Sequence, residues 1–178
     1  MKLKITPTQQ EVLLDDDEII ISKTDLAGRI TYVNRSFMRV ANFAESEVLG
    51  VQHNIVRHPD MPRGAFKLLW DTLKQEREFF GYVKNITSQG HYYWVFANVT
   101  PDRDASGNHI GYFSVRSKPS KEAVATMQAI YQEMLGVESR TNTANAAAAS
   151  IEYLQSKLKN LDTTYDRFIL SLNERSGS

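Results

Sequence analysis

Three segments rich in β-branched and aromatic residues follow one another in the middle of the chain, and they constrain the fold more than any other feature. They read "EFFGYVKNIT" (78–87), "HYYWVFANVTP" (91–101) and "HIGYFSVRSK" (109–118). The connections "SQGH" and "RDASGNH" each carry a glycine suited to a tight turn. Because strands joined by short turns pair antiparallel, the sequence predicts a three-stranded antiparallel meander.

A hairpin and several helical segments precede this meander. The stretch "EIIISKTDLAGRITYVN" contains two strand patterns on either side of a turn at Ala27-Gly28. Helical apolar spacing follows in "RSFMRVANF", "AESEVLGV" and "RGAFKLLWDTLKQER". We therefore predict an α+β fold, with a five-stranded antiparallel sheet and helices packed on one of its faces.

After Pro119 the pattern becomes helical. A helix over 121–136 is predicted, with Ser120 as its N-cap and Gly136 as its end. Apolar residues then recur at alternating intervals of three and four, at Ala144, Ala147, Ile151, Leu154, Leu158, Leu161, Tyr165, Phe168 and Leu172. This heptad spacing is typical of a coiled coil. We predict a signalling helix over 144–173 that joins a homodimer; packing on its own domain is the alternative.

Composition excludes several classes of protein. The 178 residues carry 21 basic and 21 acidic side chains, whereas a nucleic-acid-binding surface usually needs a basic excess. There is no cysteine, which excludes disulfides, thiolate metal sites and cysteine-adduct photochemistry. No apolar run approaches the ~18 residues of a membrane span, and the start lacks a signal peptide. We expect a cytoplasmic chain, or the cytoplasmic part of a membrane-anchored receptor.

The stretch "HNIVRHPDMP" (53–62) concentrates polar chemistry in a loop stiffened by two prolines. Arg57 supplies a permanent charge suited to phosphate oxygens. His53, His58 and Asp60 are separated by five and two positions, which does not place two imidazoles on one helix face. We therefore predict no metal-binding or catalytic residues here. A clamp for a charged ligand is favoured over a scaffold loop held by an Arg57–Asp60 ion pair.

Strand alternation allows a test of whether the meander could line a ligand pocket, because alternate residues share one face of a strand. One face of the first meander strand gathers Phe79, Gly81, Val83 and Asn85. An aromatic plate, a gap, an aliphatic wall and an amide suit a planar heteroaromatic ring. One face of the next strand gathers Trp94, Phe96 and Asn98. Asn98 needs a hydrogen-bond partner if it is buried.

The motifs that carry a family resemblance are "TDLAGRITYVNRSF", "VLGVQHNIVRHPDMPRGAF", "YVKN", "HYYWVFANVTPDRD" and "GYFSVRSKPS". In their order and spacing they resemble the PAS domain of bacterial aerotaxis receptors and related chemotaxis proteins, over residues 15–120, with residues 1–14 as an N-terminal cap segment. The resemblance implies a PAS fold without enzymatic activity. It also implies a noncovalently bound FAD whose redox state is reported to a downstream chemotaxis signalling domain or to chemotaxis proteins.

By resemblance, the FAD-binding residues are Asn34, Arg57, His58, Asp60 and Asn85, to which strand alternation adds Phe79, Trp94 and Asn98. Phe79 stands where the aerotaxis sensors carry tryptophan, and it offers less stacking area and no indole N–H. Haem held by His53 or His58 is the less favoured cofactor. A cofactor-free PAS domain that serves dimerisation or protein interaction is the alternative function.

Overall fold

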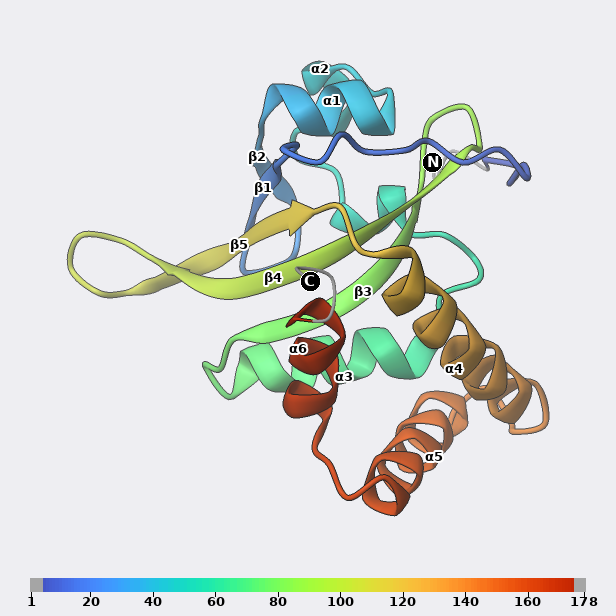
Figure 1. Cartoon of the computed structure of the whole chain (residues 1–178). Coiled ribbons are helices and arrows are strands. Elements are labelled where there is room, and N and C mark those ends of the chain that lie inside the picture. Colours follow the sequence, from blue (N-terminus) through green and yellow to red (C-terminus); the bar gives the residue numbers. More distant parts are fainter. Residues whose placement is uncertain (1–4, 175–178) are drawn as a thin grey trace.

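The five predicted strands form one antiparallel sheet. The computed structural model describes residues 5–174, so residues 1–4 of the predicted cap segment lie outside the described part. The strands are β1 (Ile20–Asp25), β2 (Ile30–Val33), β3 (Phe79–Ile86), β4 (Tyr92–Arg103) and β5 (His109–Ser117). Their order across the sheet is β2-β1-β5-β4-β3 (Figure 1). The predicted five-stranded antiparallel sheet is confirmed, and β3 lies at one edge.

Short helices between β2 and β3 cover one face of the sheet, which we call the inner face. They are α1 (Arg35–Ala41), α2 (Glu45–Val48), the 3-10 turn η1 (His53–Val56) and α3 (Arg63–Lys74). Phe37 and Val40 of α1 are buried in one cluster with Ile20 of β1 and Tyr93 and Val95 of β4. This cluster is the core of the predicted domain.

The N-terminal residues add to this core along the start of β4. The backbone N–H of Val12 donates to the carbonyl of Tyr92 at 2.7 Å, and the N–H of Tyr92 donates to the carbonyl of Gln10 at 2.9 Å. Leu14 is buried in the same cluster as Phe37. The described part of the predicted cap segment therefore packs on the domain.

Two C-terminal helices, α4 (Lys121–Ser139) and α6 (Tyr165–Glu174), cover the second face of the same sheet, which is the packing that the sequence analysis gave as the alternative (Figure 1). Between them in the chain, α5 (Ala146–Asn160) packs on α3 and α4. Trp94 of β4 stacks on Tyr131 of α4 with ring centroids 6.3 Å apart. The Tyr131 hydroxyl donates to the carbonyl of Tyr82 on β3 at 2.6 Å. The sheet is thus buried on two faces by helices from different parts of the chain.

The predicted helix over 144–173 is interrupted. Residues 161–164 separate α5 from α6, and Asp162 adopts a left-handed backbone with φ of 52°. Of the predicted seam, Leu154, Leu158 and Leu172 are buried against the chain's own α4 and sheet, whereas Leu161 is 56% exposed. In addition, α4 continues past Gly136 to Ser139. Much of the heptad pattern therefore serves packing within the chain.

A single carboxylate ties three helices together. Glu138 at the end of α4 accepts the backbone N–H groups of Arg63 at 3.1 Å and Gly64 at 2.9 Å, at the N-terminus of α3. It also accepts the hydroxyl of Ser150 on α5 at 2.6 Å. A negative charge is favourable at a helix N-terminus, where N–H groups lack partners within the helix. Glu138 therefore couples the position of α3 to that of α4 and α5.

Within residues 5–174, no helix combines the length and the apolar character needed to cross a membrane.

Gly64 allows α3 to approach α5 closely, and its replacement tests this packing. An added Cβ would lie 2.1 Å from the Ser150 Oγ and 3.1 Å from the Ala147 carbonyl oxygen. Gly64→Ala is expected to lower the free energy of unfolding by about 1–3 kcal/mol because overpacking forces the helices apart. Gly136→Ala is the matched control, since only Arg140 guanidinium atoms lie within 4 Å of its Cβ. It should stabilise the helix by about 0.5–1 kcal/mol in urea denaturation.

Leu158 and Leu161 belong to the same predicted seam but differ in burial. Leu158→Ala is expected to lower the free energy of unfolding by about 2–5 kcal/mol because it opens a cavity. Leu161→Ala should change it by less than about 0.5 kcal/mol because the side chain is exposed. Sedimentation of both variants completes the test. A dimer that dissociates in Leu161→Ala without loss of stability would show that the seam joins two chains.

Candidate functional site

A cavity of about 120 Å³ lies between the inner face of the sheet and α3. Its walls are apolar, formed by Leu69 and Trp70 of α3 and by Val83, Ala97 and Val99 of the sheet. The Trp70 ring meets the ring of Tyr112 edge to face at 5.3 Å. This volume is below the roughly 300–1,000 Å³ of most small-molecule sites. A tricyclic ring therefore fits only if side chains on α3 move.

The structure brings two of the predicted site residues, Arg57 and Asn85, to this cavity. Both line it, and their backbones pair in an isolated antiparallel bridge. The Arg57 guanidinium lies over the ring of Phe66 at 4.1 Å and donates to the Met61 carbonyl at 3.3 Å. Burial lowers the pKa of Arg57, and the nearby charge of Glu138 acts in the opposite direction. A cation and a buried amide are thus placed together on one side of the cavity.

His58 and Asp60 do not line this cavity. His58 is buried, and its Nδ1 accepts the backbone N–H of Asp60 at 3.0 Å. The pKa of His58 is lowered by burial and by the charge of Lys84. The Asp60 carboxylate receives Lys84 Nζ at 2.7 Å, so the Arg57–Asp60 ion pair of the scaffold alternative is replaced by a Lys84–Asp60 pair. In this structure the two residues brace the loop that carries Arg57.

Asn34 is used as a helix cap. Its side-chain oxygen accepts the backbone N–H groups of Phe37 and Ile21, both at 3.0 Å, and its amide donates to the Ile19 carbonyl at 2.8 Å. Its hydrogen-bonding groups are thus engaged by the backbone, and Asn34 is not among the residues that line the cavity. The structure therefore gives Asn34 a structural role between β1 and α1.

Phe79 lies on the inner face but outside the cavity. Its ring stacks on Tyr165 of α6, with centroids 5.8 Å apart and an angle of 23°. A Cβ at Gly81 would lie 3.0 Å from the Tyr165 hydroxyl. Burial raises the pKa of that hydroxyl well above its usual value. The aromatic plate and the gap predicted for a flavin are therefore occupied by a side chain from α6.

Trp94 and Asn98, which were predicted to bind the cofactor, lie on the outer face and do not line this cavity. Trp94 pairs with Lys84 of β3, and Asn98 pairs with Phe80 of β3. The cavity residues of β4 pair instead with the β3 residues that point to the inner face. Trp94 packs against α4, and the Asn98 amide donates to Glu78 at 2.7 Å and to the Phe79 carbonyl at 3.4 Å. Alternation shows which residues share a face, but it does not show which face encloses a cavity.

Several polar residues of the cavity were missed as ligand-binding candidates, among them Arg116 and Ser22. Arg116 of β5 is only 2% exposed and donates to the hydroxyl of Ser22, which lies 2.9 Å from His53 Nε2. Burial lowers the pKa of Arg116 to about 10. Burial and the charge of Arg116 lower the pKa of His53 to about 3. A sequence signal existed, because Arg116 shares a strand face with Ser114 and Tyr112 and alternation would bury it.

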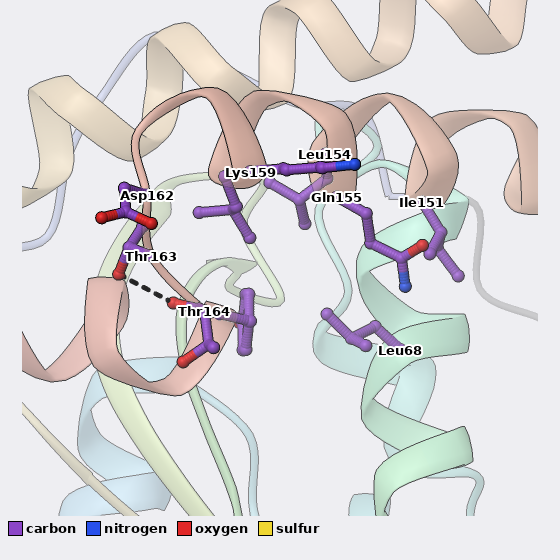
Figure 2. Close-up of a pocket in the computed structure, with 10 residues that line it drawn as sticks. Leu68, Ile151, Leu154, Gln155, Lys159, Asp162, Thr163 and Thr164 are labelled. Atoms are coloured by element: carbon purple, nitrogen blue, oxygen red, sulfur yellow. Dashed lines mark hydrogen bonds between the residues drawn. The ribbon is translucent and has the colours of Figure 1, made fainter.

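A second cavity, of about 370 Å³, lies between α3, α5 and the α5–α6 connection. Figure 2 shows Leu68 of α3 opposite Ile151 and Leu154 of α5. Tyr165, which covers Phe79, also lines this space, but none of the predicted site residues does. Among residues 5–174, no cluster of three or more His, Asp or Glu side chains could hold a metal ion. The first cavity is therefore the candidate ligand site.

His53 generates a prediction about stability and pH. In the folded protein its pKa is about 3, against about 6.5 when unfolded, so the unfolded chain binds the extra proton between these values. Stability should fall as the pH drops through about 6.5 toward 3. His53→Gln keeps a hydrogen-bonding group near Ser22 without the titration, and should reduce this loss. Urea denaturation of both proteins between about pH 7 and 5 measures this loss of stability. Parallel curves would contradict a neutral His53 imidazole in the folded protein.

Comparison with known proteins agrees with this architecture. Residues 30–116 match the family described as the PAS fold. The chain is 40% identical over 127 residues to the aerotaxis receptor of Escherichia coli K12, covering 71% of this chain and 25% of that receptor. It is 24% identical over 140 residues to the nitrogen fixation regulatory protein of Klebsiella pneumoniae, covering 79% and 28%. The chain thus spans about a quarter of the length of these relatives.

Solved structures support the same fold. A light-oxygen-voltage domain studied with a flavin analogue is similar with a TM-score of 0.54 and 22% identity, over 65% of this chain and 86% of that one. The light state of the Aureochrome1 light-oxygen-voltage domain is similar with a TM-score of 0.54 and 21% identity, over 66% and 92%. At these identities the likeness concerns the fold alone. Residues 30–116 therefore belong to the PAS family, and the chain is related over 127 residues to the bacterial aerotaxis receptor.

Proposed function

We propose that this chain is a non-enzymatic sensory module whose cavity holds the flavin ring of FAD, and that it reports redox state or oxygen for chemotaxis-type signalling. The observation that carries the proposal is the convergence of Arg57 and Asn85 on an apolar cavity of the inner face. An amide can donate to and accept from the pyrimidine edge of a flavin, and a guanidinium suits its pyrophosphate. Similarity to the aerotaxis receptor supports the same assignment.

When bound, the flavin supplies reversible electron transfer, and the protein supplies position and electrostatics. Insertion of the ring requires the α3 side chains Phe66 and Trp70 to move, because the cavity holds only about 120 Å³. Movement of α3 is transmitted to α4 and α5, since Glu138 bonds the first N–H groups of α3. Occupancy of the cavity is thereby linked to the position of the C-terminal helices.

The output side of the proposal concerns these helices. Only residues 118–120 separate the end of β5 from α4, so a shift in the sheet reaches α4 directly. We propose a homodimer through the C-terminal helices and a downstream chemotaxis signalling domain or protein as partners. We also propose that the chain is the cytoplasmic part of a longer receptor. A dimer through the buried seam requires α5 and α6 to leave their present packing.

A cofactor-free PAS domain used for assembly is the second candidate. Two observations favour it: the small volume of the cavity and the coverage of Phe79 by Tyr165. In such a protein the inner face would serve only as core. The chemotaxis-type partner would then recognise the surface of α4 to α6.

The first experiment is an absorbance spectrum of the purified protein before and after incubation with FAD, followed by acid release of any chromophore. Twin flavin bands with released FAD support the sensor. A protein that stays colourless supports the assembly module. A Soret band supports haem.

Two asparagines on opposite faces of the sheet provide a matched test of the site. Asn85→Ala is expected to weaken FAD binding about tenfold, because a good hydrogen bond contributes roughly 1–1.5 kcal/mol. Asn98→Ala removes the same amide from the outer face and should leave the affinity unchanged. Arg57→Ala should reduce FAD occupancy at limiting FAD more than at saturating FAD. Titration with FAD measures these affinities, and equal values for the two asparagine variants would refute the placement of the ring.

A further inference from the structure

Arg116 is a buried cation that has no acidic partner among residues 5–174. Its guanidinium donates to the Ser22 hydroxyl and lies over the Phe37 ring, 5.5 Å from its centroid. Its Nε has no hydrogen-bond partner among the described residues. A lone buried charge is costly unless it is paired, and the Ser22 hydroxyl and the Phe37 ring are both neutral.

The residues around Arg116 leave the cavity with a net positive charge. None of the residues that line the cavity is acidic, while Arg57 adds a second cation. The hydroxyl oxygen of Thr24, which also lines the cavity, has no partner within the described part of the chain. Charges interact strongly in such an interior because the effective dielectric constant is low. The cavity is therefore prepared for a ligand group that carries negative charge.

We propose that Arg116 anchors the electron-rich edge of the bound flavin and makes the cavity bind the reduced, anionic ring more tightly than the oxidised ring. The inference rests on the proposed function and deepens it. The oxidised ring gains two electrons and one proton on reduction and thereby acquires one negative charge. Charge placed beside the ring tunes its reduction. A ligand shifts a protein between two states only if its interaction with them differs, and Arg116 supplies such a difference.

The position of Arg116 connects this charge to the output helices. It pairs with Ile20 of β1 and with Ala97 of β4, so it lies in the middle of the sheet. Ser117 ends β5 one residue later, and α4 begins at Lys121. A stronger pull of the reduced ring on Arg116 therefore acts on β5 a few residues before α4. Arg116 is a positioning residue for signalling as well as a ligand contact.

The test is a reductive titration of the FAD-loaded protein with dithionite, which supplies both electrons and is oxidised to sulfite, while water supplies the proton. Arg116→Gln is expected to weaken binding of reduced relative to oxidised FAD at least tenfold, a fall of about 30 mV in the two-electron midpoint potential. Arg116→Lys keeps the charge and should retain most of the potential. Arg103→Gln, which removes an exposed arginine paired with Glu76, is the control and should match the wild type.

A second measurement separates this role from a structural one. Without ligand, Arg116→Met should raise the melting temperature by a few degrees, because it removes an uncompensated buried charge. A structural arginine would instead lower it, and that outcome would overturn the inference. Failure of the wild type to bind FAD would overturn the proposed function itself. Bound FAD with equal midpoint potentials in the wild type and Arg116→Gln would overturn this inference alone.

Discussion

The register between β3 and β4 is the constraint on which the rest of the structure depends. It pairs Asn85 with Tyr93 and Val83 with Val95 on the inner face, and Lys84 with Trp94 on the outer face. A shift of one residue would exchange the two faces. A slip of β3 would move the amide of Asn85 out of the cavity, and a slip of β4 would move the Trp94 ring away from Tyr131. The cavity and the attachment of the C-terminal helices therefore depend on the same set of backbone hydrogen bonds.

The helices on the two faces are not independent. Glu138 of α4 caps α3, which forms one wall of the cavity, and Tyr165 of α6 reaches the edge strand beside Gly81. Both contacts join the C-terminal helices to inner-face elements across the edge of the sheet. In a PAS domain proposed to sense a ligand, they provide physical routes between cavity and output. Two discrete arrangements of these contacts are what a switch of this kind requires.

The cavity combines limited volume with excess positive charge. In the proposed sensor, the small volume would require a flavin ring to displace side chains of α3, whereas the charge of Arg57 and Arg116 would favour an electron-rich ligand. Displacement costs packing energy, and a compensated buried charge recovers part of that cost. Under this proposal the geometry of α3 and the redox state of the ligand would be linked in one site.

The sequence by itself determined the five strands, the helical C-terminal part and the family resemblance, because turn glycines and apolar periodicity are local signals. It also named Arg57 and Asn85 as candidates, through the resemblance and the alternation of β3, and both line the cavity. Only the tertiary structure decided that Trp94 faces α4, that the heptad seam breaks at residues 161–164, and that Glu138 caps α3. The reason is physical: alternation and heptads show which residues share a face, while the partner that covers each face is chosen by contacts between distant segments. Only the tertiary structure could also show that Arg116 lacks a counter-charge within the described part of the chain, since pairing of a buried charge depends on the assembled cavity.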